Sequence, residues 1–388
     1  MINRTQWYEF FAGGGMARMG LGPHWECVFA NEWCEKKAST YVARFGVGVP
    51  KSCSELKICD VADVKLSDLP GQPALVWASF PCQDLSLAGM GAGLHGNRSG
   101  TFTPFWRLVE GLARESRSPK IVVLENVVGA ITSHGGKDFE EILRRLGDTG
   151  YVFGPLVMDA SHFVPQSRPR LFIIGVRHGF RPPTEITAPH PYDFCHSASL
   201  CQAFGRLPGL LRDSWIWWKT AVPPPREKVL ADLIEDEPSG VSWHTKEQTE
   251  RLLEMMSDVN RSKVQKARLF ERRVVGTVYR RTRPTGGGEG VQRAEVRFDD
   301  VAGCLRTPVG GSSRQIILVV EGKRIRSRLL SPREAARLMG VPDDYPIPQN
   351  YNEAYHLFGD GLAVPVVRYL DECLLTPLAS EGAASRAA

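Results

Sequence analysis

The stretch Tyr8-Glu9-Phe10-Phe11-Ala12-Gly13-Gly14-Gly15 decides the fold of this chain of 388 residues. Its apolar start predicts a strand over residues 8–11, and its glycines predict a tight turn into a helix. Small residues in such a turn let a ligand approach the backbone at the helix N-terminus. The run is only part of a dinucleotide-binding fingerprint, because Arg18 stands where a third glycine is expected. A bare turn is therefore an equal alternative.

Short apolar runs alternate with helical stretches from Trp7 to about Arg177, a pattern typical of a parallel sheet covered by helices. Besides residues 8–11, the predicted strands cover residues 27–30, 74–78, 121–124 and 171–176. Residues 137–146 carry apolar side chains at helical spacing and end at Gly147, so they predict a helix. We expect an α/β fold in which ligands bind beyond the carboxyl ends of the strands.

The sequence predicts that the chain is organised in four segments. Residues 1–180 form the main catalytic and cofactor-binding part, and the proline-punctuated residues 181–315 form a smaller, irregular domain. Residues 316–375 return to the catalytic domain, and residues 376–388 are expected to be a disordered tail. Within the returning part, Ser331-Pro332-Arg333-Glu334 predicts a helix that starts with a capping box.

The composition excludes several classes of protein. Nine cysteines are scattered singly without a metal-ligand spacing, so neither a zinc site nor a disulfide framework is expected. Free thiols favour a reducing compartment, and we expect the cytoplasm. No window reaches the length needed to span a bilayer, and the N-terminus lacks an apolar signal core. Membrane insertion and secretion are both disfavoured.

Basic residues are concentrated in one stretch. Between Arg261 and Arg283 there are nine of them, opposed only by Glu271, which leaves a net charge of +8. Such runs are often solvated helix faces. Aliphatic residues interleave here, so the stretch is expected to be folded, and a concentrated basic surface attracts phosphates. Contact with nucleic acid is predicted.

A carboxylate after the second predicted strand points to a cofactor. Asn31-Glu32-Trp33 follows the second strand, about twenty residues past the glycines, where such folds place the acid that binds ribose hydroxyls. Trp33 could stack on adenine, and Asp60 could meet the adenine amino group. Alone, these would be surface acids and a core ring. Together with the glycines they predict an adenosine-containing cofactor.

Two reactive groups follow neighbouring strands. Pro81-Cys82-Gln83 comes after the run 74–78, and a thiolate there is a nucleophile, although a lone cysteine is more often a small core residue. Glu125 ends the next run. A buried glutamate can hold a proton for an electron-poor ring nitrogen, while a capping or ion-paired glutamate is the alternative.

A third motif precedes the last predicted strand. Gln166-Ser167-Arg168-Pro169-Arg170 carries alternate arginines that are expected to project to the same side. Such arginines bind a carbonyl oxygen, a phosphate or a structural carboxylate.

Seven motifs stand in the order seen in DNA cytosine-5 methyltransferases, which this chain resembles over nearly its whole length. The similarity is weakest between about residues 181 and 310, where that family keeps its target-recognition domain. The seven are Phe10-Phe11-Ala12-Gly13-Gly14-Gly15, Asn31-Glu32-Trp33, Phe80-Pro81-Cys82-Gln83-Asp84-Leu85-Ser86, Glu125-Asn126-Val127, Gln166-x-Arg168-x-Arg170, Ser331-Pro332-Arg333-Glu334 and Gly359-Asp360-Gly361-Leu362-Ala363-Val364-Pro365-Val366.

The resemblance implies a Rossmann-like sheet that binds S-adenosylmethionine and releases S-adenosylhomocysteine. Glu32 would bind the ribose of the cofactor and Trp33 its adenine. The implied cofactor contacts are Phe11, Ala12, Gly13, Gly15, Glu32, Trp33, Asp60 and Asp360. Two positions depart from the family: Asp360 replaces the common asparagine and so lacks an amide donor, and Glu9 replaces an aspartate.

The resemblance also implies a reaction. The target cytosine leaves the duplex, Cys82 attacks ring carbon 6, and Glu125 engages ring nitrogen 3 and the amine. Arg168 would hold the cytosine carbonyl oxygen, with Arg170 supporting the pocket. Ser86 and the loop up to Arg98 would close over the base. No metal is required. Residues expected to contact the substrate are Gln83, Ser86, Arg98, Gln166, Arg306, Ser312 and Arg314.

The expected partner is double-stranded DNA, bound by a monomer. A cognate restriction endonuclease could belong to the same system without physical contact. Two alternatives remain at this point. A relative that methylates tRNA would use the same cysteine chemistry, and a silent methyltransferase-like protein would bind DNA without turnover.

Overall fold

The computed structural model describes residues 4–46, 54–81, 99–270, 272–284, 290–307 and 314–384. Contacts divide the chain into two compact units. Unit 1 comprises Met1–Asp159, Pro169–Val222 and Val366–Ala388, and unit 2 comprises Ala160–Arg168 and Pro223–Pro365. Among the described residues, no helix has both the length and the apolar character needed to cross a membrane.

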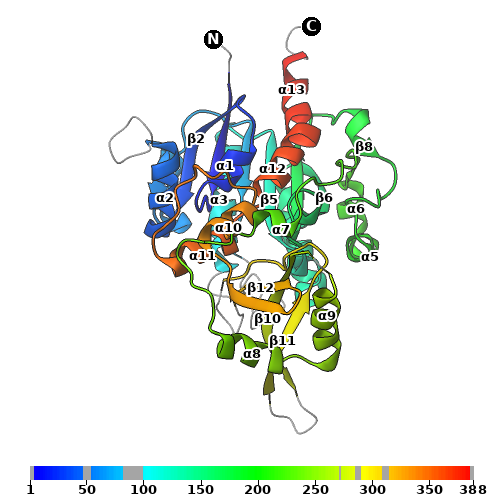
Figure 1. Ribbon diagram of the computed structural model, residues 1–388. Helices are drawn as coiled ribbons and strands as arrows, with labels where there is room; N and C mark the ends of the chain where they lie inside the picture. Colours follow the sequence, from blue (N-terminus) through cyan, green and yellow to red (C-terminus); the bar gives the residue numbers. More distant parts are fainter. Residues whose placement is uncertain are drawn as a thin grey trace. The chain divides into compact units, whose positions relative to one another are not determined.

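Unit 1 is built on a seven-stranded sheet with the order β3-β2-β1-β4-β5-β7-β6 (Figure 1). Its strands are β1 (Thr5–Phe10), β2 (Trp25–Glu32), β3 (Leu56–Ile58), β4 (Leu75–Ala78), β5 (Ile121–Val127), β6 (Tyr151–Asp159) and β7 (Pro169–Arg177). The predicted strands in β1, β2, β4 and β5 are parallel, as expected, and β3, which was not predicted, is parallel to β2. The predicted strand 171–176 departs from the expectation, because β7 runs antiparallel to both β5 and β6, a strand that was not predicted. Only residues 160–168 join β6 to β7, too few for the crossover that parallel neighbours need.

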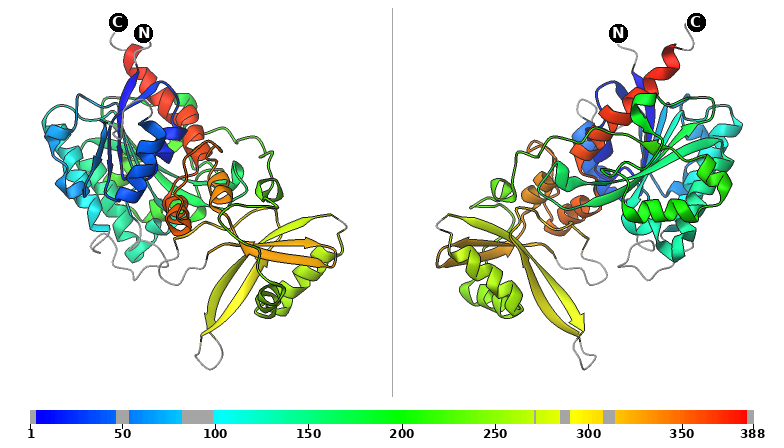
Figure 2. Two further views of the ribbon diagram at one scale, coloured as in Figure 1. Left: turned by 60° about the vertical axis from the view of Figure 1, so that its left-hand side comes forward. Right: turned by 90° about the vertical axis from the view of Figure 1, so that its right-hand side faces the viewer.

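Helices cover both faces of this sheet (Figure 2). On one face, α3 (Phe102–Arg114) and α4 (Lys137–Asp148) pack against alternate strand residues and form one hydrophobic core with them. The helix predicted at residues 137–146 is thus confirmed. On the other face lie α1 (Met16–Gly20) and α2 (Glu35–Phe45). The α/β fold therefore follows the predicted alternation.

The expected division at residue 181 is not the one that the contacts give. Residues up to Val222 stay with unit 1 because α5 (Ala198–Arg206) and α6 (Gly209–Asp213) add Leu200 and Leu211 to the core of its sheet. A short sheet of β8 (Thr187–Ala188) and β9 (Trp217–Trp218) completes this region. The Trp218 indole N–H donates to the carbonyl of Gly154 in β6 at 2.7 Å.

The C-terminal tail also differs from the expectation of disorder. Thr376–Ala384 form a helix, α13, which follows α12 (Val364–Leu370) and a π-helical turn, Asp371–Leu375. The Thr376 hydroxyl donates to buried Asp371 at 2.8 Å, and Asp371 also accepts the indole N–H of Trp25 at 2.7 Å. These hydrogen bonds connect the start of α13 to Trp25 at the start of β2, within unit 1.

Unit 2 is built on a four-stranded antiparallel sheet with the order β11-β10-β12-β13. Its strands are β10 (Val274–Pro284), β11 (Gly290–Arg297), β12 (Ile316–Glu321) and β13 (Arg324–Leu329). Residues 316–365 therefore stay with this unit, contrary to the expected return to the catalytic domain, and only the chain from Val366 onward belongs to unit 1. The helices α8 (Lys246–Glu254) and α9 (Asp258–Arg268) bury Leu252 and Val264 against one face.

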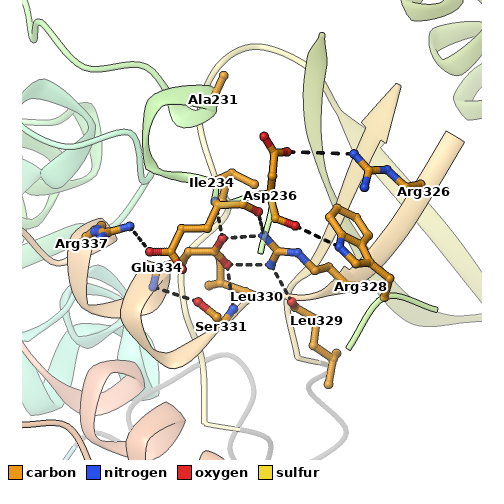
Figure 3. Close-up of polar contacts among 12 residues, drawn as sticks. Ala231, Ile234, Asp236, Arg326, Arg328, Leu329, Leu330, Ser331, Glu334 and Arg337 are labelled. Carbon is orange, nitrogen blue, oxygen red and sulfur yellow. Dashed lines mark hydrogen bonds and ion pairs between the residues drawn. The ribbon is translucent and has the colours of Figure 1, made fainter. Parts of the chain in front are cut away.

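A buried ion pair joins the sheet of unit 2 to the helix α10 (Pro332–Leu338), as Figure 3 shows. Arg328 on β13 donates to both oxygens of Glu334, at 2.7 and 2.5 Å, and neither side chain is exposed. Glu334 also accepts the backbone N–H groups of Ser331 and Glu235, each at 2.8 Å. The predicted capping box at Ser331 is thus confirmed, and its glutamate has a second role as partner of a buried arginine.

Unit 2 also contains the helices α7 (Leu230–Leu233) and α11 (Tyr351–Asp360).

Candidate active site

A glycine turn follows β1 in unit 1. Phe11, Gly13 and Gly15 all have positive φ, at 58°, 57° and 78°. A Cβ on Gly15 would come within 2.3 Å of the Phe45 ring, so packing of α2 demands glycine there. A Cβ on Gly13 would meet nothing within 4 Å, so this position faces open space. The turn therefore leaves its backbone accessible at Gly13.

Glu32 at the end of β2 holds this turn in place. Its two carboxylate oxygens accept the backbone N–H groups of Gly13 at 2.7 Å and Cys34 at 2.8 Å. A carboxylate offers about four acceptor positions, so capacity remains for a ligand hydroxyl. The neighbouring Trp33 is 69% exposed, an unusual exposure for an indole.

Asp60 lies two residues past β3, the strand next to β2. It is exposed, and its carboxylate accepts the backbone N–H of Ala62 at 2.9 Å. Phe11 packs partly against Phe105 of α3, and Ala12 is buried. An exposed ring, two carboxylates and an open glycine at the ends of adjacent strands fit an adenosine-containing methyl donor.

Glu125 and Arg170 form an ion pair in unit 1. Glu125 lies within β5 and Arg170 within β7, and register places Arg170 opposite Val127. The Arg170 Nε is 3.3 Å from a Glu125 oxygen, and both side chains are mostly buried. A carboxyl group and a planar cation thus lie side by side at one strand end. Such a pair can bind both donors and acceptors on the edge of a planar heterocycle.

Asn126 has a role that the sequence did not assign. It is buried, and its side-chain amide donates to the carbonyl of Phe80 at 3.3 Å. Phe80 belongs to the segment that follows β4 and continues through Pro81 to Cys82. Cys82 itself lies outside the described residues, as do the predicted substrate contacts Gln83, Ser86, Arg98 and Ser312.

Arg168 and Gln166, in unit 2, do not act as the sequence suggested. Arg168 is 2% exposed, and its guanidinium donates to the carbonyls of Leu305 at 2.9 Å, Gly359 at 2.8 Å and Gly361 at 2.6 Å. Gln166 is fully buried and accepts the Leu305 N–H at 3.0 Å while donating to the Leu338 carbonyl at 2.8 Å. A buried charge needs such partners, so both residues position the backbone of residues 302–307.

The structure places the two arginines differently from the expectation. Arg168 binds backbone carbonyls, whereas Arg170 lies beside Glu125. Arg168 precedes β7 rather than lying within it, so the alternation of a strand does not place the two arginines on one side.

The remaining predicted residues that the structure describes, Arg306, Asp360 and Arg314, also lie in unit 2. Arg306 is exposed, and the hydroxyl of its neighbour Thr307 donates to Asp360 at 2.6 Å. Asp360, expected to touch the cofactor, thus accepts from its own unit. Arg314 donates to Asn352 on α11 and lies over the ring of Tyr351.

The chain belongs to a class defined by this fold and site, the α/β methyltransferases that use S-adenosylmethionine. A model of the family of C-5 cytosine-specific DNA methylases matches residues 5–375. The chain therefore belongs to that family, and its reaction is methyl transfer from S-adenosylmethionine to carbon 5 of cytosine in DNA.

Known relatives agree with this assignment. The Type II methyltransferase M.HpaII of Haemophilus parainfluenzae is 26% identical, over 95% of this chain and 89% of the relative. M.NlaX of Neisseria lactamica is 27% identical, over 96% of each chain. The crystal structure of S. pombe Dnmt2 methyltransferase has the same fold, with a TM-score of 0.59, 17% identity and coverage of 97% of this chain and 99% of that one.

The buried carboxyl group of Glu9, which begins the glycine motif, predicts a pH effect on stability. Burial raises the pKa of Glu9 to about 8, although the charge of Arg18 opposes the shift. A folded-state pKa above the unfolded value means that the folded state binds the extra proton. The resulting stability is complete below the unfolded pKa and is lost as pH rises through the folded pKa.

We therefore expect the free energy of unfolding of wild type to fall, relative to Glu9→Gln, by about 3 kcal/mol between about pH 5.5 and about pH 8.5. Urea unfolding of both proteins at the two pH values measures the difference. Glu26→Gln, at an exposed position on β2, is the control and should leave the pH dependence unchanged. Parallel pH curves for wild type and Glu9→Gln would contradict the assignment.

Proposed function

We propose that Cys82, Glu125 and Arg170 together methylate cytosine within a short specific sequence of double-stranded DNA. The observation that supports this most is the hydrogen bond from Asn126 to the Phe80 carbonyl, 3.3 Å long. It ties the strand end that carries Glu125 to the segment that leads to Cys82. The Glu125–Arg170 ion pair then supplies the groups that a pyrimidine edge requires.

Each residue has a distinct task in this proposal. The Cys82 thiolate forms a bond to ring carbon 6 of an extruded cytosine, and electron density moves into the ring. Glu125, carrying a proton, shares it with ring nitrogen 3 and accepts from the exocyclic amine, while Arg170 donates to the carbonyl oxygen, so both stabilise the developing charge. S-adenosylmethionine would supply the methyl group at carbon 5 and leave as S-adenosylhomocysteine. Water takes the carbon 5 proton, and cleavage of the bond between ring carbon 6 and Cys82 then regenerates the thiolate.

The residues that hold the methyl donor come from the ends of β1, β2 and β3. Glu32 would bind the ribose hydroxyls and Trp33 the adenine, with Asp60 near the adenine amino group and Phe11, Ala12, Gly13 and Gly15 against the rest. Asp360 is proposed instead to hold the recognition segment through Thr307, since its carboxylate accepts that hydroxyl.

The biological setting is proposed from the relatives. Those named above are Type II methyltransferases of bacteria, so we propose that this chain modifies cellular DNA in the cytoplasm, alone or beside a cognate restriction endonuclease. We propose that it acts as a monomer, because one chain carries all the residues named.

The test combines methyl transfer with trapping. Labelled S-adenosylmethionine is expected to label duplex DNA and not tRNA, and bisulfite sequencing then defines the target sequence. A duplex carrying 5-fluorocytosine at that target is expected to form a denaturant-stable complex, because fluorine cannot leave as the proton does. Cys82→Ser is the control and should form none. Label in tRNA alone, or a stable complex with Cys82→Ser, would refute the proposal.

A further inference from the structure

The outer part of the β10–β11 hairpin has no covering element among the described residues of unit 2. Register pairs β12 with β10 only from Val274 to Val278, whereas β11 pairs with β10 as far as Pro284. Residues 280–283 and 290–293, which we name the ribbon, are therefore a two-stranded extension, visible at the yellow end of the sheet in Figure 2. Every residue of the ribbon is exposed.

The ribbon has no core of its own, but its strands continue into the buried part of the sheet. An isolated two-stranded hairpin is marginally stable in water. Here the ladder continues without interruption into Thr277↔Arg297, where the sheet becomes buried against α8 and α9. The ribbon is thus an extended platform that is held in place by the sheet behind it.

The ribbon is strongly basic, and its cations are all arginine. From residue 280 to residue 293 the sequence has four arginines, no lysine and a single acid, Glu289. Charged side chains also keep exposed strands from pairing, but lysine serves that purpose as well. The exclusive use of arginine favours recognition, because its planar fork binds guanine edges and phosphates bidentately.

The two faces of the ribbon carry different chemistry. Paired residues share a face, so Arg280, Thr282 and Gln292 lie together on what we name the reading face, which continues the face covered by α8 and α9. The opposite face, which we name the arginine face, carries Arg281, Arg283 and Arg293.

Glu295 orients the side chains of the arginine face. One of its oxygens accepts the Arg283 Nε–H at 2.7 Å, and the other lies 3.5 Å from the Arg281 Nε. Glu295 thus holds both arginines along this face, and because a guanidinium has five N–H donors, donors remain for phosphate oxygens. On the reading face, arginine, glutamine and a threonine methyl are the groups that discriminate guanine, adenine and thymine in the major groove.

We propose that the ribbon enters the major groove of the DNA substrate, with Arg280, Thr282 and Gln292 contacting base edges and Arg281, Arg283 and Arg293 contacting phosphates. The major groove, about 12 Å wide, admits a two-stranded ribbon. This inference rests on the proposed function, since it takes duplex DNA as the substrate. It moves base recognition away from Arg314, which is bonded to Asn352.

Two variants separate the two faces. A reading-face variant combines Thr282→Ala with Gln292→Ala, and an arginine-face variant combines Arg281→Gln, Arg283→Gln and Arg293→Gln. The control is Lys323→Gln, an exposed cation at the turn between β12 and β13, at the other end of the same sheet. All the changed side chains are exposed, so folding should be retained, and circular dichroism checks this.

The reading-face variant is expected to methylate a relaxed set of sequences in bisulfite sequencing, with discrimination at one or two positions reduced at least tenfold. The salt dependence of its affinity for DNA should match that of wild type. The arginine-face variant is expected to keep the target sequence while the slope of log affinity against log salt falls by roughly one unit per arginine. Lys323→Gln should change neither property.

The outcomes separate this inference from the proposed function. Wild type that methylates no DNA refutes the proposed function itself. If wild type methylates DNA and both ribbon variants keep its target sequence and salt slope, only the proposed role of the ribbon is refuted. A changed target sequence in the arginine-face variant overturns the assignment of the faces. A different result would assign the ribbon to contact with a second copy of the chain: wild type self-associates, the ribbon variants do not, and the salt slope of DNA binding is unchanged.

Discussion

Glu125→Gln is expected to lower the rate of methyl transfer by roughly 10²–10⁴-fold, the contribution typical of a positioned acid. Glutamine has nearly the same shape, but it cannot supply a proton or a negative charge, and it removes the ion pair with Arg170. Single-turnover methylation of a target duplex measures the chemical step. DNA affinity should change only a few-fold, because the substitution leaves the basic surface of the chain intact.

Two further variants make this result specific. Arg170→Lys keeps the charge but loses the planar fork, so we expect a smaller loss of rate that does not reach that of Glu125→Gln. Glu185→Gln, at an exposed position of the same unit, is the control and should match wild type. A wild-type rate in Glu125→Gln would remove this glutamate from the reaction.

Glu334→Gln is expected to destabilise unit 2 by about 3–5 kcal/mol, because it leaves the buried charge of Arg328 without its counter-ion. The Arg328 guanidinium donates four hydrogen bonds (Figure 3): two to Glu334, one to the Leu329 carbonyl and one to the Glu235 carbonyl. The ring of Trp243 lies 4.9 Å from the guanidinium carbon and excludes water on one side.

Urea unfolding followed by tryptophan fluorescence measures this loss. The double variant Arg328→Met with Glu334→Leu should recover most of the stability, since it removes both charges together. Asp299→Asn breaks the exposed pair with Arg297 and should cost less than about 1 kcal/mol. A similar small effect of Glu334→Gln would show that the pair is not buried in solution.

Local sequence predicted the positions of the residues on the cofactor side of the candidate site. The glycine turn, Glu32 and Trp33 lie within one β-strand–turn–helix unit and the strand next to it, and their roles depend on neighbours close in the chain. The strands themselves were longer than predicted, because Glu32 and Glu125 lie inside β2 and β5 rather than after them. A polar residue after an apolar run predicts the end of a strand, although the strand in the structure continues through that residue.

The base-binding side was predicted less well. Arg168 and Arg170 are chemically identical in the sequence, and the choice between them depends on carbonyls of Leu305, Gly359 and Gly361, more than 130 residues away. The boundary at residue 181 failed for a similar reason. Prolines indicate irregular chain, but they do not show that Leu200 and Leu211 belong to the core of the sheet.

The sequence by itself determined the family and the methyl donor, because seven ordered motifs carry that chemistry in short segments. Only the tertiary structure decided which arginine lies beside Glu125, which acid holds Arg328, and that the basic stretch divides between a helix and an exposed ribbon. The physical reason is that burial and pairing depend on residues distant in the chain, whereas turns and strand ends depend on neighbours.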